Sequence, residues 1–149
     1  MANSINKASQ LHLNIVNYQF HFPNADFAET VLSDTETTVA DLRNMVQEFV
    51  NERDWEKFHA PKNVSMALAI EAAELMEHFQ WLDVEASRDI GEDAGKVEEV
   101  GEELADVLCY GLALANTLGL DVSETMRRKM EKNRAKYPVD RYRGTFDGS

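Results

Sequence analysis

The chain has 149 residues, of which 44% are hydrophobic and 28% are charged. This composition is typical of one globular domain, and it excludes an intrinsically disordered chain. The formal net charge of −12 argues against binding to a nucleic-acid polymer, because that binding depends on many Lys and Arg side chains.

Residues 1–37 differ in pattern from the remainder of the chain. Residues 11–20 partly alternate apolar and polar side chains, which favours a strand, although a short helix also fits. Pro23 and Asn24 then end the pattern. We expect this segment to be an N-terminal arm that packs on another subunit.

From residue 38 onward the pattern is helical. Apolar residues recur at helical spacing over 39–53, and Thr38 followed by Asp41 predicts an N-cap. After a connection over 54–62, Asn63 is the predicted N-cap of a second helix over 64–80. Residues 83–95 are polar and indicate a loop.

The second half of the chain predicts two more helices. A third helix is expected over 96–118, because Gly119 is the type of residue that follows a helix C-terminus. Ser123 or Asp121 caps a fourth helix that ends before Pro138, and residues 141–149 are expected to be a flexible tail. Four helices with short links predict an all-α fold, an antiparallel four-helix bundle over residues 38–140.

The two central helices each carry a pair of carboxylates three residues apart. Glu71 and Glu74 share one face of the second helix, and Glu103 and Asp106 repeat the spacing in the third. Such pairs also arise by chance in an acidic chain, where the alternative is a solvated helix face. These pairs stand in apolar stretches, where a carboxylate is costly unless it is paired or bound to metal. Brought face to face, the four predict a site for Mg²⁺, with Mn²⁺ as a substitute.

A carboxylate site of this kind favours phosphate chemistry, because Mg²⁺ commonly shares its ligand shell with substrate phosphates. The cation also reverses the local field, so that an acidic protein can accept an anion. A di-iron site is disfavoured, since it needs Glu-x-x-His pairs and His78 stands four residues after Glu74. His78 lies two turns from Glu71 on the same face, where it can support the metal ligands.

Three aromatic residues stand near the carboxylate helices, namely Trp55, Trp81 and Tyr110. Their rings could stack on a flat base, and ordinary core packing is the alternative for each.

Polar residues flank the same helices. Lys129 and Asn133 are four residues apart in the fourth helix and could reach phosphate oxygens, or could belong to a solvated basic helix end. His59 and Asn63 could orient a substrate, or could hold the loop and cap the second helix.

The chain shows no sign of export. No apolar run reaches the about 18 residues of a membrane helix, and we find no apolar segment typical of a secretory signal. The single cysteine, Cys109, cannot form an internal disulfide and is expected to be an inert buried thiol. We therefore expect a cytoplasmic protein.

Several stretches, in their order and spacing, resemble one enzyme family. The stretches are Glu52–His59, Pro61–Asn63, Glu71–Leu75, Phe79–Trp81, Glu102–Leu108, Lys129–Asn133 and Lys136–Pro138. Together, over residues 38–140, they resemble the MazG-like all-α nucleoside triphosphate pyrophosphohydrolases, and most closely the small dCTP pyrophosphatase branch. The family often has glycine where this chain has Ile70 and Ala73, and residues 1–36 match nothing in the pattern.

The resemblance implies an Mg²⁺-dependent enzyme that cleaves dCTP or a 5-modified dCTP between the α- and β-phosphates, in nucleotide-pool cleaning. It implies a homotetramer with sites at subunit contacts. The implied ligands of Mg²⁺ are Glu71, Glu74, Glu103 and Asp106, the implied base contacts are Trp55, Trp81 and Tyr110, and the implied phosphate contacts are Lys129 and Asn133.

We add the hypothesis that Glu71 or Glu74 activates the attacking water and that Lys129 offsets charge on the leaving pyrophosphate. A related hydrolase of dUTP or phosphoribosyl-ATP remains an alternative, as does a non-enzymatic helical interaction module.

Overall fold

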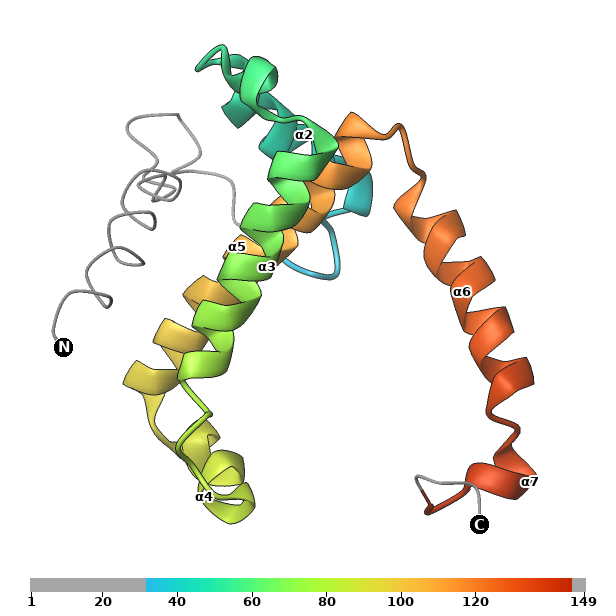
Figure 1. Ribbon diagram of the computed structural model, residues 1–149. Coiled ribbons are helices and arrows are strands. Elements are labelled where there is room, and N and C mark those ends of the chain that lie inside the picture. The colour runs from blue at the N-terminus through green and yellow to red at the C-terminus, as the bar shows by residue number, and fades with distance from the viewer. Residues whose placement is uncertain (1–31, 146–149) are drawn as a thin grey trace, which may run out of the picture.

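The computed structural model describes residues 32–145, and every regular element in that range is helical (Figure 1). The elements are α2 (Val39–Asn51), η2 (Trp55–Phe58), α3 (Pro61–Glu77), α4 (Val84–Arg88), η3 (Asp89–Glu92), α5 (Ala94–Thr117), α6 (Val122–Lys136) and α7 (Val139–Tyr142). The predicted all-α class is confirmed. The strand or helix predicted over 11–20 lies outside the described residues.

Helix α2 begins as the sequence predicts. The Asp41 amide donates to Thr38 Oγ1 at 3.2 Å, and the Thr38 amide donates to Asp41 Oδ2 at 2.8 Å. This reciprocal pair satisfies two backbone donors that would otherwise lack partners at the helix start. The helix ends at Asn51, two residues before the predicted end, and Asp54 then adopts a left-handed conformation with φ of 52°.

Helix α3 begins earlier than predicted, at Pro61, and Asn63 is not its N-cap. Proline suits the first helical position, because its missing amide hydrogen would have no partner there and its fixed φ is helical. Asn63 lies inside the first turn, where its side-chain amide donates to the Phe58 carbonyl at 3.1 Å. Asn63 therefore ties the η2 turn to α3. The helix ends at Glu77 rather than at residue 80.

The loop predicted over 83–95 is wrong, because two short helical elements and the start of α5 occupy it. Asp83 accepts from the Ala86 amide at 2.8 Å and caps α4. Asp93 accepts from the amides of Gly95 and Lys96 and caps α5. Aspartate is common in loops as well as at helix starts, so the polar composition of this segment does not distinguish a loop from short helices.

The end of α5 and the start of α6 confirm the predicted signals. Gly119 has φ of +61°, and the amides of Gly119 and Leu120 donate to the carbonyls of Asn116 and Ala115. This is a Schellman arrangement, which favours glycine at the left-handed position. Of the two predicted caps of α6, Asp121 is the one used, and it accepts from the Glu124 amide at 2.8 Å. The short helix α7 (Val139–Tyr142) extends into the tail expected over 141–149, so the prediction of a flexible tail is wrong for residues 141 and 142.

Helices α3 and α5 run antiparallel and share the most extensive helix contact, while α2 packs on α5 (Figure 1). Side chains of Val46, Val64 and Ala113 form the buried centre of this packing. The fourth long helix does not join this packing within one chain, because α6 bends away from α5 by 103° and stands apart (Figure 1).

No single described helix is long and apolar enough to cross a membrane, and only the bent α5–α6 pair passes by length and composition.

Candidate metal centre

The antiparallel pairing of α3 and α5 brings three of the four predicted carboxylates together. Glu71 and Glu74 lie one turn apart on α3, and Glu103 faces them from α5. One oxygen from each of these carboxylates lies within 4.8 Å of the others. Glu71 is 5% exposed and is the one charged side chain buried in the described range.

Asp106 lies one turn beyond Glu103 on α5, outside that close group of three. It is half-buried, and burial is the main cause that raises the pKa of its carboxyl, followed by the charge of Glu74 and then that of Glu102. The charge of Glu74 acts on Asp106, so Asp106 is within electrostatic range of the group. The structure therefore brings all four predicted carboxylates to one region, with three of them in close proximity.

The electrostatics of the group favour a bound cation. Burial raises the pKa of Glu103 first, and the charges of Glu74 and Asp106 raise it further, whereas His78 lowers it. In an octahedral Mg²⁺ site with bonds of about 2.1 Å, neighbouring ligand oxygens are about 3 Å apart and opposite ones about 4.2 Å apart. Carboxylate oxygens within 4.8 Å of one another need only small side-chain movements to meet that geometry. The residues present thus fit a hard divalent cation.

An open pocket of about 410 Å³ adjoins the group, lined by Glu74, Glu77, His78 and Glu103. Mg²⁺ retains several water ligands and binds through one or two carboxylates plus phosphate oxygens. The pocket supplies the space beside the carboxylates that such additional ligands require.

Trp55 and Trp81 lie beyond opposite ends of α3. The Trp55 ring packs edge-on against Phe49 with centroids 5.7 Å apart, whereas Trp81 is 87% exposed. Since α3 has 17 residues, it separates the two by about 25 Å along its axis. One chain therefore does not bring both indoles to one base. Tyr110 is half-buried and packs against the core of α2, α3 and α5.

His59 fastens the connection before α3. Its Nδ1 lies 2.8 Å from the Trp55 carbonyl oxygen, and the Thr117 hydroxyl donates to the His59 carbonyl at 3.4 Å. Its side chain also lines a cavity of about 230 Å³ between α2, η2 and α5. The sequence analysis missed most of the polar side chains of that cavity, which are Gln47, Glu56, Asn116 and Thr117.

Tertiary pairing explains why these residues were missed. Arg43 Nε donates to Asn116 Oδ1 at 2.8 Å, and Asn116 Nδ2 donates to the Arg43 carbonyl at 2.9 Å. These partners are 73 positions apart, so no local pattern relates them. Glu56 alone had a signal, since it lies within the motif Glu52–His59.

Lys129 and Asn133 lie on α6, away from the carboxylates of their own chain. Lys129 is exposed, and the contact that Asn133 makes is a weak one from Nδ2 to Met130 Sδ at 3.9 Å. The structure therefore does not bring the predicted phosphate contacts to the predicted metal ligands within one chain.

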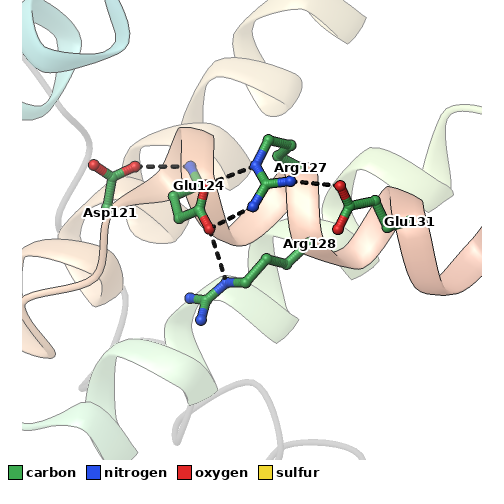
Figure 2. Close-up of polar contacts among 5 residues, drawn as sticks. All are labelled: Asp121, Glu124, Arg127, Arg128 and Glu131. Carbon is green, nitrogen blue, oxygen red and sulfur yellow. Dashed lines mark hydrogen bonds and ion pairs between the residues drawn. The ribbon is translucent and has the colours of Figure 1, made fainter.

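Ion pairs within α6 stabilise it without tertiary packing. Figure 2 shows Arg127 between Glu124 and Glu131, with Arg128 also paired to Glu124 at 3.5 Å. All of these pairs are three or four residues apart, the spacing at which side chains of one helix meet. Glu124 also follows the capping Asp121 (Figure 2), so its charge lies near the helix N-terminus, where it is favourable.

Comparison with known proteins identifies the family of this chain. The profile of the MazG-like family matches residues 66–145, and the chain belongs to this family. It is 42% identical over 113 residues to dCTP pyrophosphatase 1 of Rattus norvegicus and 40% identical over 104 residues to that of Homo sapiens. These matches cover 74% and 70% of this chain, which spans 65% and 61% of the length of the two relatives.

A solved structure is also similar. The crystal structure of a pyrophosphatase from Archaeoglobus fulgidus matches with a TM-score of 0.62 and 37% identity. The match covers 72% of this chain and 99% of the archaeal chain. The family predicted from the sequence motifs is therefore confirmed, and so is the fold that the resemblance implied.

Proposed function

We propose that this protein is a Mg²⁺-dependent pyrophosphohydrolase that converts dCTP, or a 5-modified dCTP, to the monophosphate and pyrophosphate. The observation that carries the proposal is the group of Glu71, Glu74 and Glu103, whose oxygens lie within 4.8 Å of one another beside an open pocket. The similarity to proteins named dCTP pyrophosphatase 1 supports the substrate. We propose a role in removing surplus or modified dNTPs from the cytoplasmic nucleotide pool.

The carboxylates divide the work by their position. Glu71, Glu74 and Glu103 would hold Mg²⁺, with Asp106 beside them as the fourth ligand group. The ion, when bound, supplies charge neutralisation and polarises phosphoryl oxygens, with Mn²⁺ as a substitute. Glu74 lines the pocket, so we assign to it, ahead of the buried Glu71, the orientation and deprotonation of the attacking water. Water adds across the α–β anhydride, and the bond to the leaving pyrophosphate breaks.

A complete site requires more than one chain. Trp55 and Trp81 lie beyond opposite ends of α3, so a base between aromatic rings needs Trp81 or Trp55 from a second subunit. The 87% exposure of Trp81 is consistent with a role at a subunit contact. We propose that Tyr110 completes the base site next to the carboxylates, and that His59 and Asn63 hold the connection that carries Trp55.

The surface of α6 supports the same arrangement. Met126, Lys129, Met130 and Asn133 follow one another at spacings of three and four residues, so they share one face of the helix. Both methionines are exposed. Exposed apolar residues also lie on α3 and α5, for example Met66, Leu104 and Leu108. We propose that this face of α6 packs on another subunit of a homotetramer and delivers Lys129 and Asn133 to the partner's phosphates.

Mixing two defective variants tests the shared site. Glu71→Gln removes one carboxylate of the metal site, and Lys129→Ala removes the ammonium group proposed to contact the phosphates. Each variant assembled by itself should therefore have little activity. If each site takes its parts from two chains, mixed assemblies contain some complete sites, and activity should return toward about one quarter of the wild-type value after random exchange. Mixtures that stay as inactive as the separate variants, although native mass spectrometry shows exchange, would contradict the shared site.

Product analysis tests the reaction itself. The protein is incubated with each common dNTP, dUTP, 5-methyl-dCTP and phosphoribosyl-ATP, with Mg²⁺ or with EDTA, and the products are separated. We expect dCMP or 5-methyl-dCMP plus pyrophosphate, formed with Mg²⁺ and absent with EDTA. Turnover that persists in EDTA would reject the metal site, and preferred turnover of dUTP or phosphoribosyl-ATP would reject the substrate. No turnover of any substrate by folded protein would favour the interaction module.

A further inference from the structure

The pocket beside the carboxylates has one lining side chain that is not acidic. Glu74, Glu77 and Glu103 line it together with His78, which is half-buried at the C-terminal end of α3. A carboxylate accepts hydrogen bonds and repels an anion, whereas an imidazole always carries at least one N–H donor. His78 is therefore the one side chain of the pocket lining that can donate a hydrogen bond to a phosphate oxygen.

The position of His78 follows from the helix. Glu71, Glu74 and His78 occupy one face of α3, at spacings of three and four residues. His78 is the C-cap residue, with helical φ of −62° and ψ of −21°, so it continues the row of the two glutamates along that face, and all three positions are close to or part of the pocket lining. The row thus passes from the carboxylates to a hydrogen-bond donor in about two turns.

The ring is near the carboxylates without being joined to them. Its charge lowers the pKa of Glu103, which shows that it is within electrostatic range. Among the described residues we find no hydrogen bond or ion pair from the ring, and its nitrogens are not part of the close oxygen group. Since His78 lines the pocket and its ring makes no hydrogen bond to a described residue, its N–H is available to a molecule that enters the pocket.

We propose that His78 is a substrate-contacting residue that donates a hydrogen bond to the phosphate chain in this pocket. The proposal rests on the proposed function, because the triphosphate must lie beside the carboxylates that hold the cation. The phosphate chain is placed there because Mg²⁺ shares its ligand shell with substrate phosphates. A pyrophosphate group bound through Mg²⁺ presents acceptor oxygens on the side away from the ion, and a hydrogen bond to a charged acceptor is stronger than one between neutral groups.

The test uses the full chain and inorganic pyrophosphate with Mg²⁺ as the probe, measured by calorimetry. His78→Leu removes the donor, whereas His78→Gln keeps one, and Gln80→Leu is the control for a new leucine on an exposed neighbour. We expect His78→Leu to weaken pyrophosphate binding by about 5- to 20-fold. The pyrophosphate affinity of His78→Gln should stay within about threefold of that of the wild type, and Gln80→Leu should have the affinity of the wild type.

Two further measurements separate this role from a structural one or from an effect on the metal. Mn²⁺ binding without pyrophosphate, followed by electron paramagnetic resonance, should be unchanged in both His78 variants, and thermal unfolding should confirm that they fold. Unchanged pyrophosphate binding in His78→Leu would overturn the proposal. So would an equal loss of Mn²⁺ affinity, or a wild-type protein that does not bind pyrophosphate with Mg²⁺.

The outcome is distinguishable from failure of the proposed function. Pyrophosphate binding that depends on His78, in a protein that does not turn over dCTP, would retain the contact and reject the reaction. Turnover of dCTP with pyrophosphate binding that is indifferent to His78→Leu would retain the reaction and reject the contact.

Discussion

Replacing Glu103 by glutamine should stabilise the metal-free protein while removing its response to Mg²⁺. Glu103 interacts unfavourably with the charges of Glu74 and Asp106, and its oxygen lies within 4.8 Å of the oxygens of Glu71 and Glu74. Two unit charges 4.8 Å apart repel each other by about 1 kcal/mol in a water-like medium and by about 3.5 kcal/mol at an effective dielectric constant of 20. The amide is nearly isosteric and removes this repulsion.

The pocket is open to solvent, so the lower part of that range applies. We expect a gain of about 1–2 kcal/mol, which raises the midpoint of thermal unfolding by about 3–8 °C in a domain of this size. Mg²⁺ should stabilise the wild type and not the variant. It should raise the midpoint of the wild type, because a ligand at one hundred times its Kd stabilises the native state by about 2.7 kcal/mol. It should leave Glu103→Gln almost unchanged.

The assay is differential scanning calorimetry in EDTA and in millimolar Mg²⁺. Glu98→Gln is the matched control, since Glu98 is an exposed glutamate on the same helix, outside the close group. It should behave like the wild type in both buffers. If Glu103→Gln unfolds at a lower temperature than the wild type in EDTA, the carboxylates do not repel one another as proposed. If Mg²⁺ still raises the unfolding midpoint of Glu103→Gln, this carboxylate is not part of a cation site.

The remaining predictions concern the same helices. Burial and neighbouring carboxylates raise the folded-state pKa of Glu103 and Asp106 above the ordinary values of 4.5 and 3.8, so the associated stability is present at low pH and is lost as pH rises through the folded pKa values. The excess stability of Glu103→Gln in EDTA should therefore be near zero at pH 3.5 and grow toward pH 7, and a constant difference would refute this cause. Glu71→Gln should lower kcat with dCTP by at least about 1000-fold while the circular dichroism spectrum is retained, because it removes charge from the centre of the cation site. Near-normal turnover would reject the assignment. Burial, and then the charge of Asp106, raise the pKa of Cys109 to about 11, so folded protein at pH 8 should react slowly with a thiol reagent and unfolded protein at once. Equal rates in the two states would show that the thiol is not shielded.

Local signals were sufficient to place most helices. The Thr38–Asp41 capping pair, Gly119 and Asp121 each satisfy backbone groups within a few residues, so their role follows from the nearby sequence. Where the local sequence fits two structures equally well, the prediction was wrong. Asp83 and Asp93 cap helices in a segment predicted as a loop, and Asn63 binds the preceding turn, while proline starts the helix.

The group of carboxylates on α3 and α5 was also predictable to a large extent, since each pair of carboxylates lies within one helix. Each helix places two carboxylates on one face by its own periodicity, and apolar neighbours indicate that this face is buried. The two long helices α3 and α5 are separated in the chain only by residues 78–93, which hold α4 and η3, and their antiparallel packing brings the two faces together. The family resemblance pointed to the same residues before the fold was known.

Tertiary structure decided what depends on distances between elements. It placed Asp106 beside the close group of three oxygens, Trp55 and Trp81 beyond opposite ends of α3, and the Arg43–Asn116 pair across 73 positions. It also turned α6 away from the helices it was expected to cover within one chain. Periodicity shows which face of a helix is apolar but not which surface covers that face, because burial against the same chain and burial against another chain select the same residues.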